Sequence, residues 1–153
     1  MLKKLSSIFL ILIMIFTFYG CNNSSMPFNG DIEFNEISLT IPEDFIRDST
    51  QSSEDLWIFE QGGYKKYIII TRSDITGDTF ESLENYVDYM KDNDADSSLT
   101  TFLDNDAVLS TYELDGLYCQ EILFPHNESF YAVALRGSTA DEFNTLTNTI
   151  ALQ

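Results

Sequence analysis

Short runs in which apolar and polar residues alternate fill most of the chain after residue 36, and such runs are typical of half-buried β-strands. The clearest run spans residues 37–41, and two more, at 56–59 and 67–71, flank a Gly-Gly pair and predict a hairpin. Four further runs predict strands at residues 99–103, 107–113, 117–124 and 129–136. Since tight turns such as Asp115-Gly116 connect them, these strands should form an antiparallel sheet.

Two segments carry apolar residues at helical spacing instead. The first opens with Asp-Thr-Phe-Glu at residues 78–81, which is a capping-box pattern, and its apolar face comprises Phe80, Leu83, Val87 and Met90. The second opens with Thr-Ala-Asp-Glu at residues 139–142, and its stripe comprises Phe143, Leu146 and Ile150. The order of elements predicts an α+β fold in which an antiparallel sheet packs against two main helices on one face.

The length and composition define one domain and restrict its partners. Residues 36–153 can bury a core as a single domain, whereas residues 21–35, rich in Asn, Ser, Pro and Gly, are expected to form a flexible linker. The chain has 25 acidic and 8 basic residues and a formal charge of −17. This balance excludes the basic surface that nucleic-acid binding requires. It suits a soluble, monomeric domain, and selection for a cationic ligand is the alternative.

The first 20 residues have the pattern of a secretory signal peptide. Lys3 and Lys4 provide the positive start, and residues 8–18 form an apolar run that only Thr17 interrupts. A transmembrane helix needs about 20 apolar residues, so the shorter run here favours a cleaved signal over a retained membrane helix.

Cys21 follows Phe18, Tyr19 and Gly20, and this string resembles the lipobox of bacterial lipoproteins. In that family the cysteine is diacylated and becomes the new N-terminus after cleavage. Gly20 fits the family pattern, whereas leucine is usual at the position of Phe18 and a small residue at that of Tyr19. The resemblance implies a diacylglyceryl anchor of palmitate type on Cys21, which would hold the chain on the extracytoplasmic side of a bacterial cell membrane. A conventional signal peptide is the alternative.

Three strings resemble the PsbP-like fold, which photosystem II PsbP proteins, the Ran-binding Mog protein and DcrB-type lipoproteins share. Residues 37–45 resemble the opening strand of that family, and residues 80–87 resemble its first long helix. Residues 130–135 and the helix that follows them resemble its end. The resemblance covers residues 36–152. It implies a PsbP-like sandwich and a binding or accessory role, and it transfers no catalytic residue, because fold alone does not establish function.

The cysteine and histidine content argues against an enzyme. If Cys21 carries the anchor, Cys119 cannot form an intramolecular disulfide, and its position in a predicted strand indicates a small buried residue. His126 is the only histidine and lies in a predicted turn, which favours neither a Cys–His nucleophile nor a zinc site. We therefore predict no catalytic residue, and a hydrolase with paired carboxylates is a weaker alternative.

One acidic stretch partly matches a calcium-binding loop. Asp92, Asp94 and Asp96 occupy positions one, three and five of that pattern. Ser97 replaces the glycine at position six and Leu103 the glutamate at position twelve, so an EF-hand is excluded. The stretch is either a solvated acidic loop or a weak Ca²⁺ site of about millimolar affinity. No other cofactor is expected.

The chain has more aromatic residues than a small core can bury, so some should face solvent. Their rings suit contacts with protein, glycan or apolar ligands. Candidates for such a binding surface are Trp57, Tyr64, Tyr67 and Tyr118. The sequence thus suggests a membrane-anchored, non-catalytic binding or accessory module with a protein or small-ligand partner. Weak cation or small-ligand binding is the alternative function.

Overall fold

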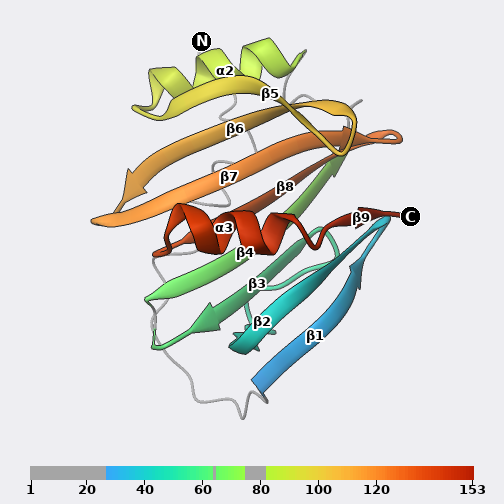
Figure 1. The fold of residues 1–153 in the computed structure, drawn as a ribbon, viewed down its shortest axis with the longest axis vertical. Helices are drawn as coiled ribbons and strands as arrows, with labels where there is room; N and C mark the ends of the chain where they lie inside the picture. The colour runs from blue at the N-terminus through green and yellow to red at the C-terminus, as the bar shows by residue number, and fades with distance from the viewer. Residues whose placement is uncertain (1–26, 64, 75–81) are drawn as a thin grey trace.

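A computed structural model describes residues 27–63, 65–74 and 82–153, and this part of the chain contains nine strands and two helices (Figure 1). The strands pair antiparallel throughout, in the order β1-β2-β3-β4-β8-β7-β6-β5, with β9 paired to β2. No helix in these ranges is both long enough and apolar enough to cross a membrane. The elements are β1 (Pro27–Phe34), β2 (Ile37–Arg47), β3 (Leu56–Gln61), β4 (Lys66–Asp74), α2 (Leu83–Asp92), β5 (Asp96–Phe102), β6 (Asn105–Leu114), β7 (Leu117–His126), β8 (Ser129–Arg136), α3 (Ala140–Thr147) and β9 (Ala151–Leu152).

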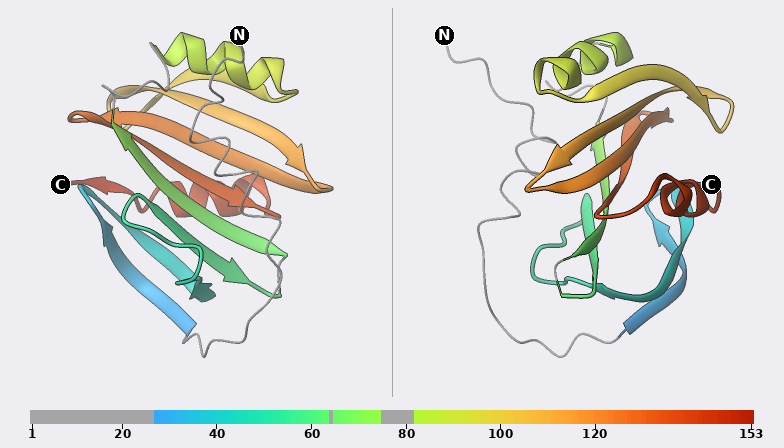
Figure 2. Two further views of the ribbon diagram at one scale, coloured as in Figure 1. Left: turned by 180° about the vertical axis from the view of Figure 1, so that it is seen from behind. Right: turned by 60° about the vertical axis from the view of Figure 1, so that its left-hand side comes forward.

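The two helices cover opposite faces of the sheet. Phe124 of β7 packs in a core cluster with Phe143 of α3, whereas the adjacent Leu123 packs with Met90 of α2. Successive strand residues point to opposite faces, and α3 accordingly lies in front of the strands in Figure 1 and behind them in the rear view of Figure 2. The predicted α+β fold is confirmed, but the expectation of both helices on one face is wrong. An apolar stripe predicts that one side of a helix packs against the sheet, but it does not predict which face of the sheet the helix covers.

The strand β1 lies within the segment that was expected to be a linker. Ile32 and Phe34 are 6% and 0% exposed, and they lie opposite Leu39 and Ile37 of β2. The linker prediction for residues 21–35 is therefore wrong for residues 27–34. The Asn and Gly content of this segment favoured a linker, although apolar residues alternate with polar ones at positions 32 and 34, as in a strand. The signal segment, Cys21 and the rest of residues 1–26 lie outside the described ranges.

Side-chain caps begin both helices, one where expected and one later. In α3 the hydroxyl of Thr139 accepts from the amide of Glu142, whose carboxylate accepts from the Thr139 amide, so this capping box is confirmed. In α2 the cap is Ser82, whose hydroxyl accepts from the amide of Asn85. The first helix thus starts at Leu83, and the predicted capping box at residues 78–81 lies wholly outside the described ranges.

The sheet opens between β2 and β3. These strands pair only at the end of β2, through Ile46 and Arg47, while β9 pairs with the start of β2 at Ile37 and Ser38. The segment after α3 therefore lies along the part of β2 that β3 leaves unpaired. This arrangement brings the C-terminal residues beside β1 and β2, where a pocket forms.

Candidate functional site

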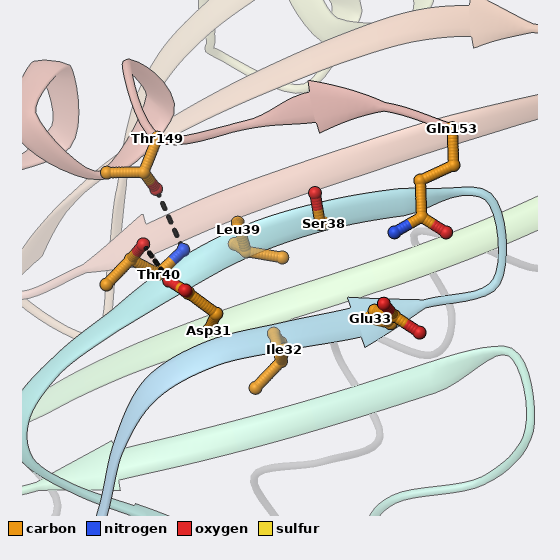
Figure 3. A pocket seen from close by; sticks show the side chains of 8 residues that line it. All are labelled: Asp31, Ile32, Glu33, Ser38, Leu39, Thr40, Thr149 and Gln153. Atoms are coloured by element: carbon orange, nitrogen blue, oxygen red, sulfur yellow. Dashed lines mark hydrogen bonds between the residues drawn. The ribbon is translucent and has the colours of Figure 1, made fainter.

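A pocket of about 500 Å³ lies over the β1–β2 hairpin and beside the segment that follows α3 (Figure 3). We refer to it as the β1–β2 pocket. It is open to solvent, and its lining is mostly polar. The described residues that line it are Asp31, Ile32, Glu33, Ser38, Leu39, Thr40, Thr149 and Gln153.

The alternation along the two strands produces this polar surface. In β1 the exposed carboxylates Asp31 and Glu33 flank the buried Ile32, and in β2 Ser38 and Thr40 are half-buried. The register pairs Asp31 with Thr40 and Glu33 with Ser38. Because directly opposite residues project from the same face, two carboxylates and two hydroxyls share the outward face of the hairpin.

Hydrogen bonds fix the polar groups at one end of the pocket. The hydroxyl of Thr40 donates to Asp31 Oδ1 over 2.7 Å, and its amide donates to Thr149 Oγ1 over 3.0 Å. The Thr149 hydroxyl in turn donates to the carbonyl of Leu146 over 2.7 Å, which ties the pocket to α3. The described lining has two carboxylates and no lysine or arginine. It therefore suits an ammonium or guanidinium group that can donate several hydrogen bonds.

The aromatic residues proposed as a binding surface fall into different environments. Tyr67 is 8% exposed, so the prediction that it lies on the surface is wrong. Its ring packs among buried residues of β3, β4 and β8, and the Arg136 guanidinium lies 5.6 Å from the ring centre. Tyr118 is 44% exposed, as predicted. Tyr64 lies outside the described ranges.

Trp57 is half-buried between the sheet and solvent. Its ring meets that of Phe34 edge-on at 5.2 Å, and the guanidinium of Arg47 lies 3.8 Å from its ring centre. Both contacts hold β3 to the β1–β2 hairpin, at the place where the strand pairing is sparse. Trp57 is therefore engaged within the fold.

The three aspartates of the predicted calcium loop do not converge. Asp92 ends α2, Asp94 lies in a turn with φ of 63°, and Asp96 begins β5; all three are exposed. The amides of Asp94 and Ala95 donate to carbonyl groups in the last turn of α2, so the segment terminates the helix. The described ranges contain no group of three or more His, Cys, Asp or Glu side chains that could hold a metal ion.

A buried carboxyl group lies beneath α2, and no motif in the sequence had singled it out. Glu121 of β7 is 1% exposed and accepts hydrogen bonds from the hydroxyls of Tyr86 in α2 and, at 3.5 Å, Tyr112 in β6. Ser110 lies directly opposite it and shares a 2.9 Å hydrogen bond with Ser97. Burial raises the pKa of Glu121, and the two tyrosine hydroxyls partly offset this effect. The sequence signal that could have identified this group is a single carboxylate, that of Glu121, within a mostly apolar predicted strand.

Replacing Glu121 with glutamine should make stability less dependent on pH. The folded-state pKa of Glu121 is raised above its ordinary value of 4.5, so its favourable contribution is complete below that value and is lost as the pH rises through the folded pKa. We expect Glu121→Gln, which keeps an acceptor for Tyr86, to gain stability relative to the wild type from pH 4 to pH 8. Urea denaturation at each pH measures this difference, and a constant difference would contradict the assignment.

Cys119 is another buried titratable group, and it is 2% exposed, as predicted. Its thiol donates to the carbonyl of Leu117, and burial raises its pKa to about 11. His126 lies at the other end of the same strand, about 23 Å away along an extended chain, and its Nε2 lies 3.2 Å from the carbonyl oxygen of Gln153. The structure therefore does not bring these two residues together.

Comparisons with known proteins identify the fold. No family model and no curated protein matches the sequence. The solution structure of a cyanobacterial PsbP (CyanoP) from Synechocystis sp. PCC 6803 aligns with a TM-score of 0.58 and 10% identity, over 88% of this chain and 98% of that one. A crystal structure from Bacteroides thetaiotaomicron VPI-5482 aligns with a TM-score of 0.53 and 16% identity over 82% of this chain, which spans about half (49%) of that protein. The domain thus has a PsbP-like fold.

Proposed function

We propose that this chain is a membrane-anchored, extracytoplasmic binding or accessory module that contacts its partner through the β1–β2 pocket. The observation that carries the proposal is the pocket itself, an open site in which Asp31 and Glu33 stand beside the hydroxyls of Ser38 and Thr40. The likeness to CyanoP, which concerns the fold, is compatible with an accessory role.

The charge of the pocket favours a cationic partner. Asp31 and Glu33 are both exposed, and the chain as a whole carries a formal charge of −17. A field of one sign speeds the approach of an oppositely charged partner and rejects partners of like charge. The partner group that fits best is a lysine or arginine side chain of another protein, because a guanidinium or ammonium can bond carboxylates and hydroxyls at once.

A binding role agrees better than catalysis with the positions of the titratable groups. A catalytic site needs groups of shifted pKa within reach of a substrate. The strongly buried groups of raised pKa include Glu121, Cys119 and Tyr86, which are 1%, 2% and 2% exposed and lie within the core. The β1–β2 pocket lies on another part of the molecule, over the first two strands. We therefore propose a module without catalytic activity.

The proposed anchor is a diacylglyceryl group on Cys21. Two acyl chains give lasting attachment, whereas a single chain gives only marginal binding. The segment between Cys21 and β1 is short, so the anchor would keep the pocket close to the membrane. Since an anionic bilayer repels an acidic domain, the charge of the domain leaves the pocket available to a protein partner.

A crosslinking pull-down from native membranes tests the proposed function. The pocket variant Asp31→Asn/Glu33→Gln should lose a partner that the wild type captures, because it removes both carboxylates and retains the shape of the pocket. The Cys21→Ser variant should leave the membrane fraction and lose the same partner. Salt should weaken the capture in the wild type, since exposed charges are screened.

The matched control is Asp106→Asn/Glu113→Gln, which removes the same two charges from exposed positions on β6. This variant should capture the partner as the wild type does. Equal capture by the pocket variant and the control would show that the β1–β2 pocket is not the contact. Persistence of Cys21→Ser in the membrane fraction would refute the anchor.

A further inference from the structure

The strand β1 forms one end of the sheet. Among the described strands it pairs only with β2, and it stands first in the strand order (Figure 1). An edge strand presents peptide N–H and C=O groups that have no partner in the sheet, and another extended chain can bond to them. The carboxylates that line the β1–β2 pocket, Asp31 and Glu33, belong to this strand.

The register shows which peptide groups of β1 face outward. Thr40 lies opposite Asp31, and its amide donates away from β1, to Thr149. Asp31 and Thr40 are therefore a pair without mutual backbone hydrogen bonds, and such pairs alternate with bonded ones along an antiparallel ladder. Glu33, two residues further on, and Ser38 opposite it also form a pair without mutual backbone hydrogen bonds. The peptide groups of Asp31 and Glu33 thus point toward the open edge.

The same two residues also provide the charge at this edge. Their side chains are exposed on one face of β1, while Ile32 between them is 6% exposed and faces the core. A strand added to β1 would place its residues opposite Asp31 and Glu33 on the charged face, because directly opposite residues share a face. In the added strand, the residue between these two would lie opposite Ile32 on the apolar face.

We propose that β1 accepts an extended basic segment of a partner protein as an additional antiparallel strand. Lysine or arginine would lie opposite Asp31 and Glu33, and an apolar residue would lie opposite Ile32. This inference rests on the proposed function and adds the binding mode and the chemical pattern of the partner. The backbone bonds supply a general attachment, and the alternating side chains supply the specificity.

Charge complementarity favours this occupant over a second copy of the chain. If two copies of β1 paired antiparallel about Ile32, Asp31 of each would lie opposite Glu33 of the other. Like charges placed directly opposite destabilise a strand pair, and two chains that each carry a formal charge of −17 repel as they approach. Charged residues on an edge strand reduce self-association in this way, and they leave pairing with a basic strand favourable.

A capped peptide of sequence Thr-Val-Lys-Val-Lys-Val-Thr tests the proposal against the full lipidated chain in detergent micelles. Calorimetry should detect binding, and hydrogen exchange should show increased protection of the amides of Asp31 and Glu33. Replacing both lysines with glutamate should abolish binding. Asp31→Asn/Glu33→Gln should weaken binding by about tenfold, as the loss of two exposed ion pairs implies, whereas Asp106→Asn/Glu113→Gln should not.

N-methylated peptides separate strand addition from simple capture of a cation. Methylation of the two lysine amides removes the donors that would face β1 and keeps both charges, so binding should fall at least about tenfold, as expected for two lost hydrogen bonds. Methylation of two valine amides, which would face away from β1, should leave binding nearly unchanged.

Each outcome bears on one proposal or on both. Equal binding of the lysine-methylated and parent peptides, still weakened by Asp31→Asn/Glu33→Gln, would overturn strand addition and leave the β1–β2 pocket as a cation site. Failure of the parent peptide to bind, while the pull-down still depends on the pocket, would overturn only the inference drawn here. Failure of both experiments would overturn the proposed function as well.

Discussion

Substitution of Gly137 by alanine should destabilise the protein by about 3 to 5 kcal/mol, the combined cost of a strained backbone and an enforced clash. Gly137 has φ of 74°, and an added Cβ would lie 1.9 Å from the carbonyl oxygen of Lys65. That oxygen is a backbone atom, so relief of the clash would require the turn before β4 to move away from the end of β8. Urea denaturation of Gly137→Ala and the wild type measures the loss.

Gly116 provides the matched control for this prediction. It also has φ of 74°, in the tight turn between β6 and β7, but an added Cβ would have no neighbour within 4 Å. Gly116→Ala should therefore lose only about 1 kcal/mol, the cost of the left-handed conformation alone. Losses of equal size for the two variants would contradict the close approach of Gly137 to Lys65.

Substitution of Phe124 by alanine should have the second large effect, a loss of about 3 to 5 kcal/mol. Phe124 is fully buried in β7, and its ring stacks on that of Tyr131 at 6.0 Å and contacts that of Phe102 at 5.1 Å. Removal of the ring would leave a cavity beneath α3 that these neighbours cannot fill. Thermal and urea denaturation measure the cost.

Tyr118 is the control on the same strand. Its side chain is 44% exposed, so Tyr118→Ala should change stability by no more than about 0.5 kcal/mol. Equal losses of stability from the two substitutions would contradict an arrangement in which α3 covers the Phe124 end of β7 and leaves the Tyr118 end exposed. The contrast between Phe124 and Tyr118 thus tests the placement of α3.

Local patterns in the sequence predicted much of the fold. The Asp115-Gly116 turn and the capping box of Thr139 depend only on neighbouring residues, and both are present. The pairing of β4 with β8, in contrast, joins segments far apart in the chain, and no local pattern encodes it. The strand β9 has two residues, which is too short for any periodicity. Local chemistry therefore predicts elements and turns, whereas distant packing decides their neighbours.

The candidate site was largely hidden from the sequence for the same reason. The β1–β2 pocket combines Asp31, in a segment that resembled a linker, with Thr149 near the end of the chain. In the folded chain both residues form hydrogen bonds with Thr40, which lies between them. For the acidic triplet that begins at Asp92 the outcome was the reverse: regular spacing predicted a site, but the three carboxylates do not come together. The spacing of ligand residues predicts a metal site only where the backbone adopts the loop conformation that the motif assumes.

Site-specific photocrosslinking in intact cells tests most directly whether the β1–β2 pocket contacts a partner. A photoreactive amino acid would replace Ser38, which lines the pocket, or Ser98, an exposed serine on β5 at the opposite end of the sheet. We expect a discrete adduct from position 38 and none from position 98, with the crosslinked partner peptide containing lysine or arginine on either side of an apolar residue. No adduct at position 38, or the same adduct from both positions, would contradict a binding role for the pocket.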